Sequence, residues 1–269
     1  MARLPNAGTA LPRRAGGRIL AAALVAATLA AWLVTVDRMD GMDAGPGTDL
    51  GQLGWFTGMW VTMMAAMMLP SAAPMVMFVE RVSRDRDGGR RRGVERAVVF
   101  VAGYLAVWSA FGLAAYGIYR LLAGADPSVL HWDGGGRWVA GAVVAAAGVY
   151  QLTPLKRICL RHCRSPLHFL LHGWHDGSAG ALRMGTVHGA YCAGCCWGLM
   201  LVLFAVGVMS IPWMIVVALV IFAEKILPFG DRIAAPLAVA LVALGLWIGL
   251  DPGSVPFLTD PGQGLQMPM

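Results

Sequence analysis

Long apolar runs, separated by short segments that hold nearly all the charges, constrain the fold of this chain more than any other feature. Most of the runs are about 17–25 residues long, and about 20 apolar residues in a helix cross the ~30 Å hydrocarbon layer of a bilayer. Lipid offers the backbone no hydrogen-bonding partner, so runs that are apolar on every face are expected to be helices rather than barrel strands. We therefore predict an all-α transmembrane bundle with about seven spans, at residues 19–36, 55–79, 97–122, 138–152, 185–208, 213–224 and 234–250, with a minimal turn at 210–212 before the sixth.

Composition agrees with the bilayer as the solvent of most of the chain. Hydrophobic residues make up 58% of the chain and charged residues 13%, against roughly 25% charged in an ordinary soluble domain. The net charge of +6 comes from arginines beside apolar spans, and no DNA- or RNA-binding motif accompanies it. Nucleic acid is therefore excluded as a partner.

Loop charges predict the orientation. Residues 81–96 and 156–183 are rich in Arg and Lys, whereas the first loop, at residues 37–49, is acidic. Lys and Arg remain on the cytoplasmic side, so the N-terminus is predicted to be cytoplasmic and the C-terminus external. A signal peptide is the competing interpretation of residues 19–36, but no small-residue cleavage site follows them. The predicted divisions are a basic cytoplasmic leader at 1–18, a transmembrane domain at 19–252 with cytoplasmic loops at about 80–96, 154–184 and 225–232, and an external tail at 253–269.

Glycines spaced four residues apart occur on two of the expected spans. Small residues at this spacing allow helix backbones to approach closely in lipid. We interpret them as packing positions without chemistry of their own. The pairs are Gly185 and Gly189, Gly194 and Gly198, and Gly245 and Gly249.

The densest group of unusual side chains lies on the fifth expected span. His188, Cys192 and Cys195 follow the spacing i, i+4, i+7, so one helical face presents an imidazole and two thiols, with Cys196 beside them. Thiolate and imidazole are ligands that copper(I) and zinc select. The alternative is simple packing, because cysteine is also a small hydrophobe that is common in buried helices.

Two further groups of sulfur atoms favour the metal interpretation. Cys159 and Cys163 lie one helical turn apart, just past the fourth span. The second span carries a methionine stripe, and thioether sulfur suits copper(I), although methionine also fills gaps in cores. Cys195 and Met67 both fall near the expected midplane, so a shared site would form if their helices touch. The candidate thioether ligands are Met63, Met64, Met67 and Met68.

Two other groups have open interpretations. His168, His172 and His175 would share one face of a helix, either as a metal-collecting site or as an interfacial amphipathic helix. Glu224 and Lys225 end the sixth span, where they are either a helix-end feature with snorkelling side chains or part of a proton or ion path.

Several stretches resemble one prokaryotic family of predicted metal-binding integral membrane proteins, a family built on a domain of unknown function. They are residues 60–75 (WVTMMAAMMLPSAAPM), 150–166 (YQLTPLKRICLRHCRSP) and 189–200 (GAYCAGCCWGLM), together with Glu224 and Lys225. The resemblance covers about residues 55–249. It implies a bacterial inner-membrane location and a metal role for the five cysteines, Cys159, Cys163, Cys192, Cys195 and Cys196.

The leading hypothesis is a membrane protein that binds copper(I), or else zinc, and transports it or delivers it to a membrane or metal-carrier protein. No enzymatic activity is expected. One alternative is a scaffold or assembly subunit whose cysteines are structural. Another is a membrane thiol–disulfide oxidoreductase that uses Cys192 and Cys195, which would place these thiols toward the oxidising external side.

Overall fold

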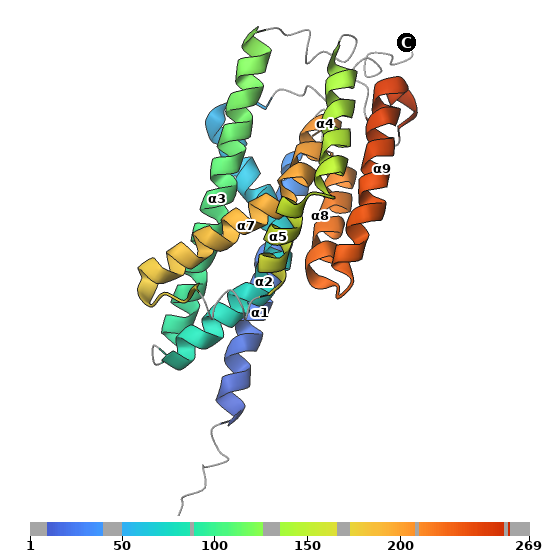
Figure 1. Ribbon diagram of the computed structural model, residues 1–269. Coiled ribbons are helices and arrows are strands. Elements are labelled where there is room, and N and C mark those ends of the chain that lie inside the picture. The colour runs from blue at the N-terminus through green and yellow to red at the C-terminus, as the bar shows by residue number, and fades with distance from the viewer. Residues whose placement is uncertain are drawn as a thin grey trace, which may run out of the picture.

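The computed structural model is helical throughout, and no strand occurs in the residues that it describes, which are 10–39, 50–86, 89–125, 135–165, 173–207, 210–255 and 258. The helices pack as an elongated bundle (Figure 1). In chain order they are α1 (Ala10–Met39), α2 (Leu53–Arg86), α3 (Arg90–Ala125), α4 (Arg137–Tyr150), α5 (Pro154–Arg164), α7 (Gly177–Val206), α8 (Ile211–Ile226) and α9 (Gly230–Leu250), and the short 3-10 turn η4 (Pro252–Ser254) follows.

Each of the seven expected spans falls on a helix. Among the described residues, five helices are long and apolar enough to cross a membrane, and the number is six if α4 and α5, which meet at 66°, form one broken span. Helix α8 has only 16 residues, so seven crossings remain a prediction. Helix α1 begins at the lower end of the view in Figure 1 and α9 ends at the upper end, as an odd number of crossings requires.

Helices also fill much of the expected loops. Helix α2 continues to Arg86 and α3 begins at Arg90, so both extend past membrane length. Helix α5 lies wholly within the expected loop at 154–184. It begins where the side chain of Thr153 accepts a hydrogen bond from the backbone N–H of Lys156 (3.3 Å), with Pro154 in the first turn. Both features favour a helix start, and the break before them redirects the chain so that α5 packs against α7.

The glycines predicted to allow close packing do so. Gly185 and Gly189 of α7 lie against the backbone of Phe100 and Tyr104 on α3, where an added Cβ would meet their carbonyl oxygens. Gly245 of α9 packs in the same way against α4. Glycines thus lie at the contacts of α3 with α7 and of α4 with α9, where they let the helix backbones approach closely.

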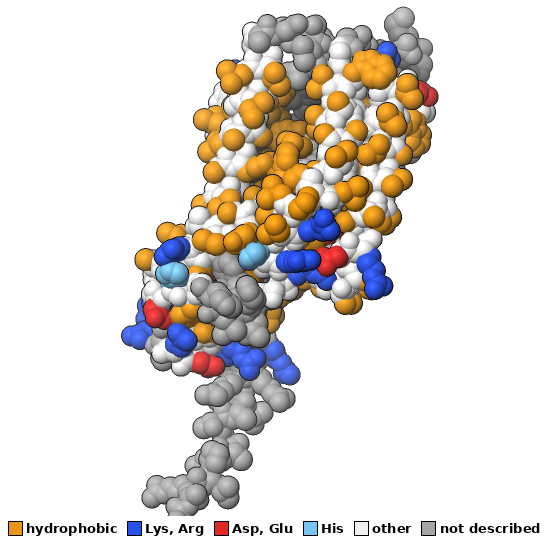
Figure 2. Space-filling model, viewed as in Figure 1, with side chains coloured by type: hydrophobic (Ala, Val, Ile, Leu, Met, Phe, Trp, Pro, Cys, Tyr) orange, Lys and Arg blue, Asp and Glu red, His pale blue; other side chains and the backbone are white. Residues whose placement is uncertain are grey.

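The surface carries a broad apolar band. Leu33, Leu121 and Leu250 are 71%, 75% and 72% exposed, and Figure 2 shows hydrophobic side chains over most of the upper part of the visible face. Arginine and lysine side chains gather at the lower end of the same face (Figure 2). Exposed apolar area of this extent suits contact with lipid rather than with water.

Candidate metal centre

Three thiols of the fifth expected span lie inside the bundle, on the stretch of α7 that α5 covers. Cys192, Cys195 and Cys196 are each at most 1% exposed. The Sγ atom of Cys195 lies 3.2 Å from that of Cys196 and also contacts the backbone carbonyl of Cys192. The expected cysteine-bearing face is therefore buried, and its thiols lie close to one another.

Helix α5 adds a fourth thiol to this cluster. The Sγ atoms of Cys163 and Cys195 are 3.8 Å apart. Two thiolates that share one tetrahedral ion with bonds of about 2.3 Å would be separated by about 3.8 Å. This pair, formed between two helices, is thus spaced like two ligands of one metal ion. The four thiols of Cys163, Cys192, Cys195 and Cys196 are called the thiol cluster below.

Lys225 of α8 reaches into the thiol cluster. Its ammonium donates to the Sγ atom of Cys192 at 2.8 Å and to the hydroxyl of Ser71 at 3.3 Å. The hydroxyl of Tyr104 on α3 lies 2.9 Å from the same sulfur. Lys225 is 7% exposed, so its side chain does not snorkel to an interface. An ammonium and a phenol around one sulfur are the partners that a thiolate needs in an apolar interior.

A second buried charge pair lies directly beside this contact. The ammonium of Lys156 on α5 donates to both carboxylate oxygens of Glu224 on α8, at 2.6 and 2.8 Å. Both side chains are 1% exposed. Because Glu224 precedes Lys225, one turn at the end of α8 connects the ion pair to the thiol cluster.

Two candidate ligands lie next to the thiol cluster rather than in it. Cys159 sits one turn before Cys163, and its sulfur packs where a side chain at Gly194 would lie. His188 is 3% exposed and its ring packs between those of Phe100 and Tyr104, with centroids 5.7 and 5.8 Å away. His188 thus supports Tyr104, which contacts Cys192.

The methionine stripe faces the interior. Met63, Met64, Met67 and Met68 are at most 2% exposed and belong to the same apolar core as the cysteines. Helix α2 packs mainly against α1 and α3, whereas α7 packs mainly against α3 and α5. The two helices nevertheless meet where the ring of Trp60 packs near that of Phe204, with centroids 5.4 Å apart. The stripe therefore lines the core that it shares with the thiol cluster.

The loop histidines occupy separate places. His162 stacks on Tyr191 with ring centroids 4.2 Å apart. His175 lies beside Arg183, with 2.6 Å between their nitrogen atoms. His168 and His172 fall outside the described residues, so the expected three-histidine face is not described.

All five cysteines are free. Over the described parts of the chain, no three His, Cys, Asp or Glu side chains are arranged to hold a metal ion. Cys163, Cys195 and Cys196 meet through the sulfur of Cys195. The lysine ammonium of Lys225 is the cation that contacts Cys192.

Sequence reasoning missed three members of the site, namely Ser71, Tyr104 and Lys156. Tyr104 is a polar residue within an apolar span, which was an available signal. Ser71 is also a polar residue within an apolar span, but it follows Pro70 and was a weaker indication of a site. Lys156 lies in an arginine-rich segment that predicted only a cytoplasmic loop.

Comparison with known proteins identifies the family of this chain. No curated protein and no solved structure is similar enough to match the chain. The family PpoB2, described as a copper chaperone, matches residues 57–248. The match covers more than half of the chain and includes the thiol cluster and both buried lysines. The expectation of a metal-related family is therefore confirmed, and the chain belongs to the PpoB2 family of copper chaperones.

Proposed function

We propose that this protein is a membrane-embedded copper chaperone of the bacterial inner membrane that binds copper(I) in the thiol cluster and hands it to a copper-requiring protein partner. It performs no enzymatic reaction. The observation that carries the proposal is the convergence of three buried thiols on α7 and the half-buried thiol of Cys163 on α5, beside one lysine ammonium. Thiolates are the ligands that select copper(I), and they do not favour hard ions.

Charge balance supports a copper(I) site at this position. Two thiolates on one copper(I) ion carry a net charge of −1, and a buried charge is costly unless it is paired. The Lys225 ammonium, 2.8 Å from the Cys192 sulfur, supplies the one positive charge required. Three thiolates on zinc have the same net charge, so zinc is the competing ion and is tested in parallel.

Metal content tests the site directly. Protein purified in detergent after expression with added copper or zinc is expected to hold near-stoichiometric copper by mass spectrometry. Serine at Cys192, Cys195 and Cys196 together should abolish it. Cys159→Ser is the matched control and should retain copper, because Cys159 lies against Gly194 rather than against another thiol. Copper retained by the triple variant, or zinc in place of copper, would overturn the assignment.

Delivery and transport differ in where the copper ends. In proteoliposomes supplied with a copper(I) donor, a chaperone keeps copper bound to protein and releases it to a thiol-bearing acceptor. A transporter instead accumulates copper in the lumen in proportion to time. We expect protein-bound copper without accumulation. Luminal copper that exceeds the amount of protein several-fold would replace delivery with transport.

A further inference from the structure

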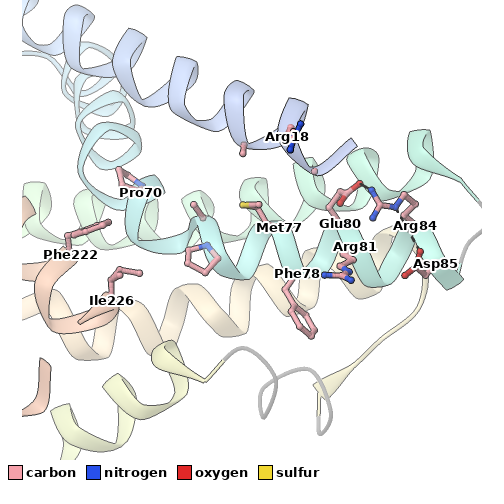
Figure 3. A pocket seen from close by; sticks show the side chains of 14 residues that line it. Arg18, Pro70, Met77, Phe78, Glu80, Arg81, Arg84, Asp85, Phe222 and Ile226 are labelled. Carbon is pink, nitrogen blue, oxygen red and sulfur yellow. Dashed lines mark hydrogen bonds and ion pairs between the residues drawn. The ribbon is translucent and has the colours of Figure 1, made fainter. Parts of the chain in front are cut away.

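A cavity opens between α1, α2 and α8. Its volume is about 900 Å³. Figure 3 shows α2 bending as it passes the cavity, where Pro70 and Pro74 interrupt its hydrogen bonds. Six lining residues mark the extent of the cavity: Arg18, Pro70, Met77, Arg81, Phe222 and Ile226.

The outer part of the cavity is positively charged. Arg18, Arg81 and Arg84 line it together with Glu80 and Asp85. Arg84 engages both carboxylates, at 3.1 Å from Glu80 and 3.9 Å from Asp85. Arg18 and Arg81 are exposed and form no ion pair with any described residue. Three arginines and two carboxylates leave the mouth with a net charge of +1, which favours an anionic occupant.

The inner part of the cavity ends next to the metal centre. Pro70 and Ile226 line it, and they adjoin Ser71 and Lys225 in the sequence. The contact between Ser71 and Lys225 joins α2 to α8 at 3.3 Å, and the same ammonium contacts the Cys192 sulfur at 2.8 Å. A single polar contact thus connects the cavity wall with the thiol cluster.

We propose that the cavity is the docking site of the copper donor, an anionic complex of copper(I) with two small-molecule thiolates. This inference rests on the proposed function. The volume lies in the range of small-molecule sites, about 300–1,000 Å³, and the apolar walls with a basic mouth match an anionic complex with organic side groups. Copper(I) passes by ligand exchange without a change of oxidation state. Two Cu–S bonds to the donor break and two form to protein sulfurs. Each protein thiol that carries a proton passes it to a departing donor sulfur, and a donor sulfur displaced by a protein thiolate leaves as a thiolate.

Loading kinetics test the docking site. Protein in phosphatidylcholine nanodiscs receives copper(I) either as the anionic bis-glutathione complex or as the cationic acetonitrile complex. Arg81→Glu should slow copper loading from the anionic donor about tenfold. Its loading rate from the cationic donor should stay within about twofold of the wild-type rate. Arg120→Glu makes the same charge change on an exposed residue of α3 outside the cavity, and it should affect neither donor. Ala73→Trp, which fills the cavity, should slow both donors, unlike Ala114→Trp on the exposed surface of α3.

The outcomes separate the two proposals. Wild-type protein that takes copper from neither donor overturns the proposed function itself. Full loading with equal rates for Arg81→Glu and Arg120→Glu overturns only the docking site. An Arg81→Glu effect that occurs only when anionic phosphatidylglycerol is added assigns the cavity to lipid and also overturns the docking site. The final copper content of Arg81→Glu should equal that of wild type, because Arg81 lies outside the thiol cluster.

Discussion

The ion pair between Lys156 and Glu224 gives the sharpest test of how the centre is held together. The Lys156 ammonium contacts both carboxylate oxygens of Glu224, at 2.6 and 2.8 Å, and each side chain is 1% exposed. Replacing Lys156 by Met leaves the carboxylate buried without its partner, which costs about 3–5 kcal/mol in comparable sites. For a chain of this size that corresponds to a fall in melting temperature on the order of 10 °C. Helix α5 would also loosen against α8 and take Cys163 away from Cys195.

A double variant tests whether the lost ion pair causes the loss of stability in Lys156→Met. Lys156→Met combined with Glu224→Leu removes both charges, and such replacements are often neutral or stabilising. The double variant should therefore melt above Lys156→Met and near wild type. Arg157→Met, at the exposed neighbour of Lys156, controls for loss of a basic residue. Thermal unfolding in detergent, followed by size-exclusion chromatography of the surviving fraction, measures each case. A melting temperature of Lys156→Met within about 2 °C of wild type would refute the reasoning. A double variant that is less stable than Lys156→Met would also refute it.

Three further predictions concern the contacts around Cys192 and the packing of α7. Lys225→Met should weaken copper binding by about 10–100-fold in competition with a copper(I) chelator. Two unit charges about 4 Å apart attract by about 4 kcal/mol at an effective dielectric constant near 20, and desolvation of the charges offsets part of this attraction. Unchanged affinity would show that the lysine is no counter-ion. Tyr104→Phe removes one hydrogen bond to Cys192 and should lower affinity by only about 3–10-fold in the same assay. Gly185→Val should abolish folded protein on size-exclusion chromatography, since its side chain would meet the backbone of Phe100, whereas Val at the exposed Gly54, where an added Cβ meets nothing within 4 Å, should be tolerated.

The helices and the thiol-bearing face of α7 follow from local sequence. Apolar length predicts each helix that carries an expected span, because lipid leaves the backbone no other way to pair its polar groups. Helix α5, which lies in an expected loop, is the exception. The spacing of His188, Cys192 and Cys195 fixes a common face, because a helix repeats every 3.6 residues. Glycine spacing likewise predicted that α7 is closely packed at Gly185 and Gly189, although the partner helix, α3, was not predicted. These properties depend on neighbours in the chain, so one sequence suffices to see them.

The composition of the centre required the tertiary structure. Cys159 and Cys163 share a face of α5, and only the 66° bend between α4 and α5 decides that Cys163 meets Cys195 while Cys159 meets Gly194. From the sequence, Lys225 could either extend to a membrane interface or lie on a proton or ion path. The packing of α8 against α2 and α7 buries it beside Cys192. Sequence therefore determined which side chains share a helical face. The angles at which helices cross, which depend on contacts far apart in the chain, decided which of them form the site.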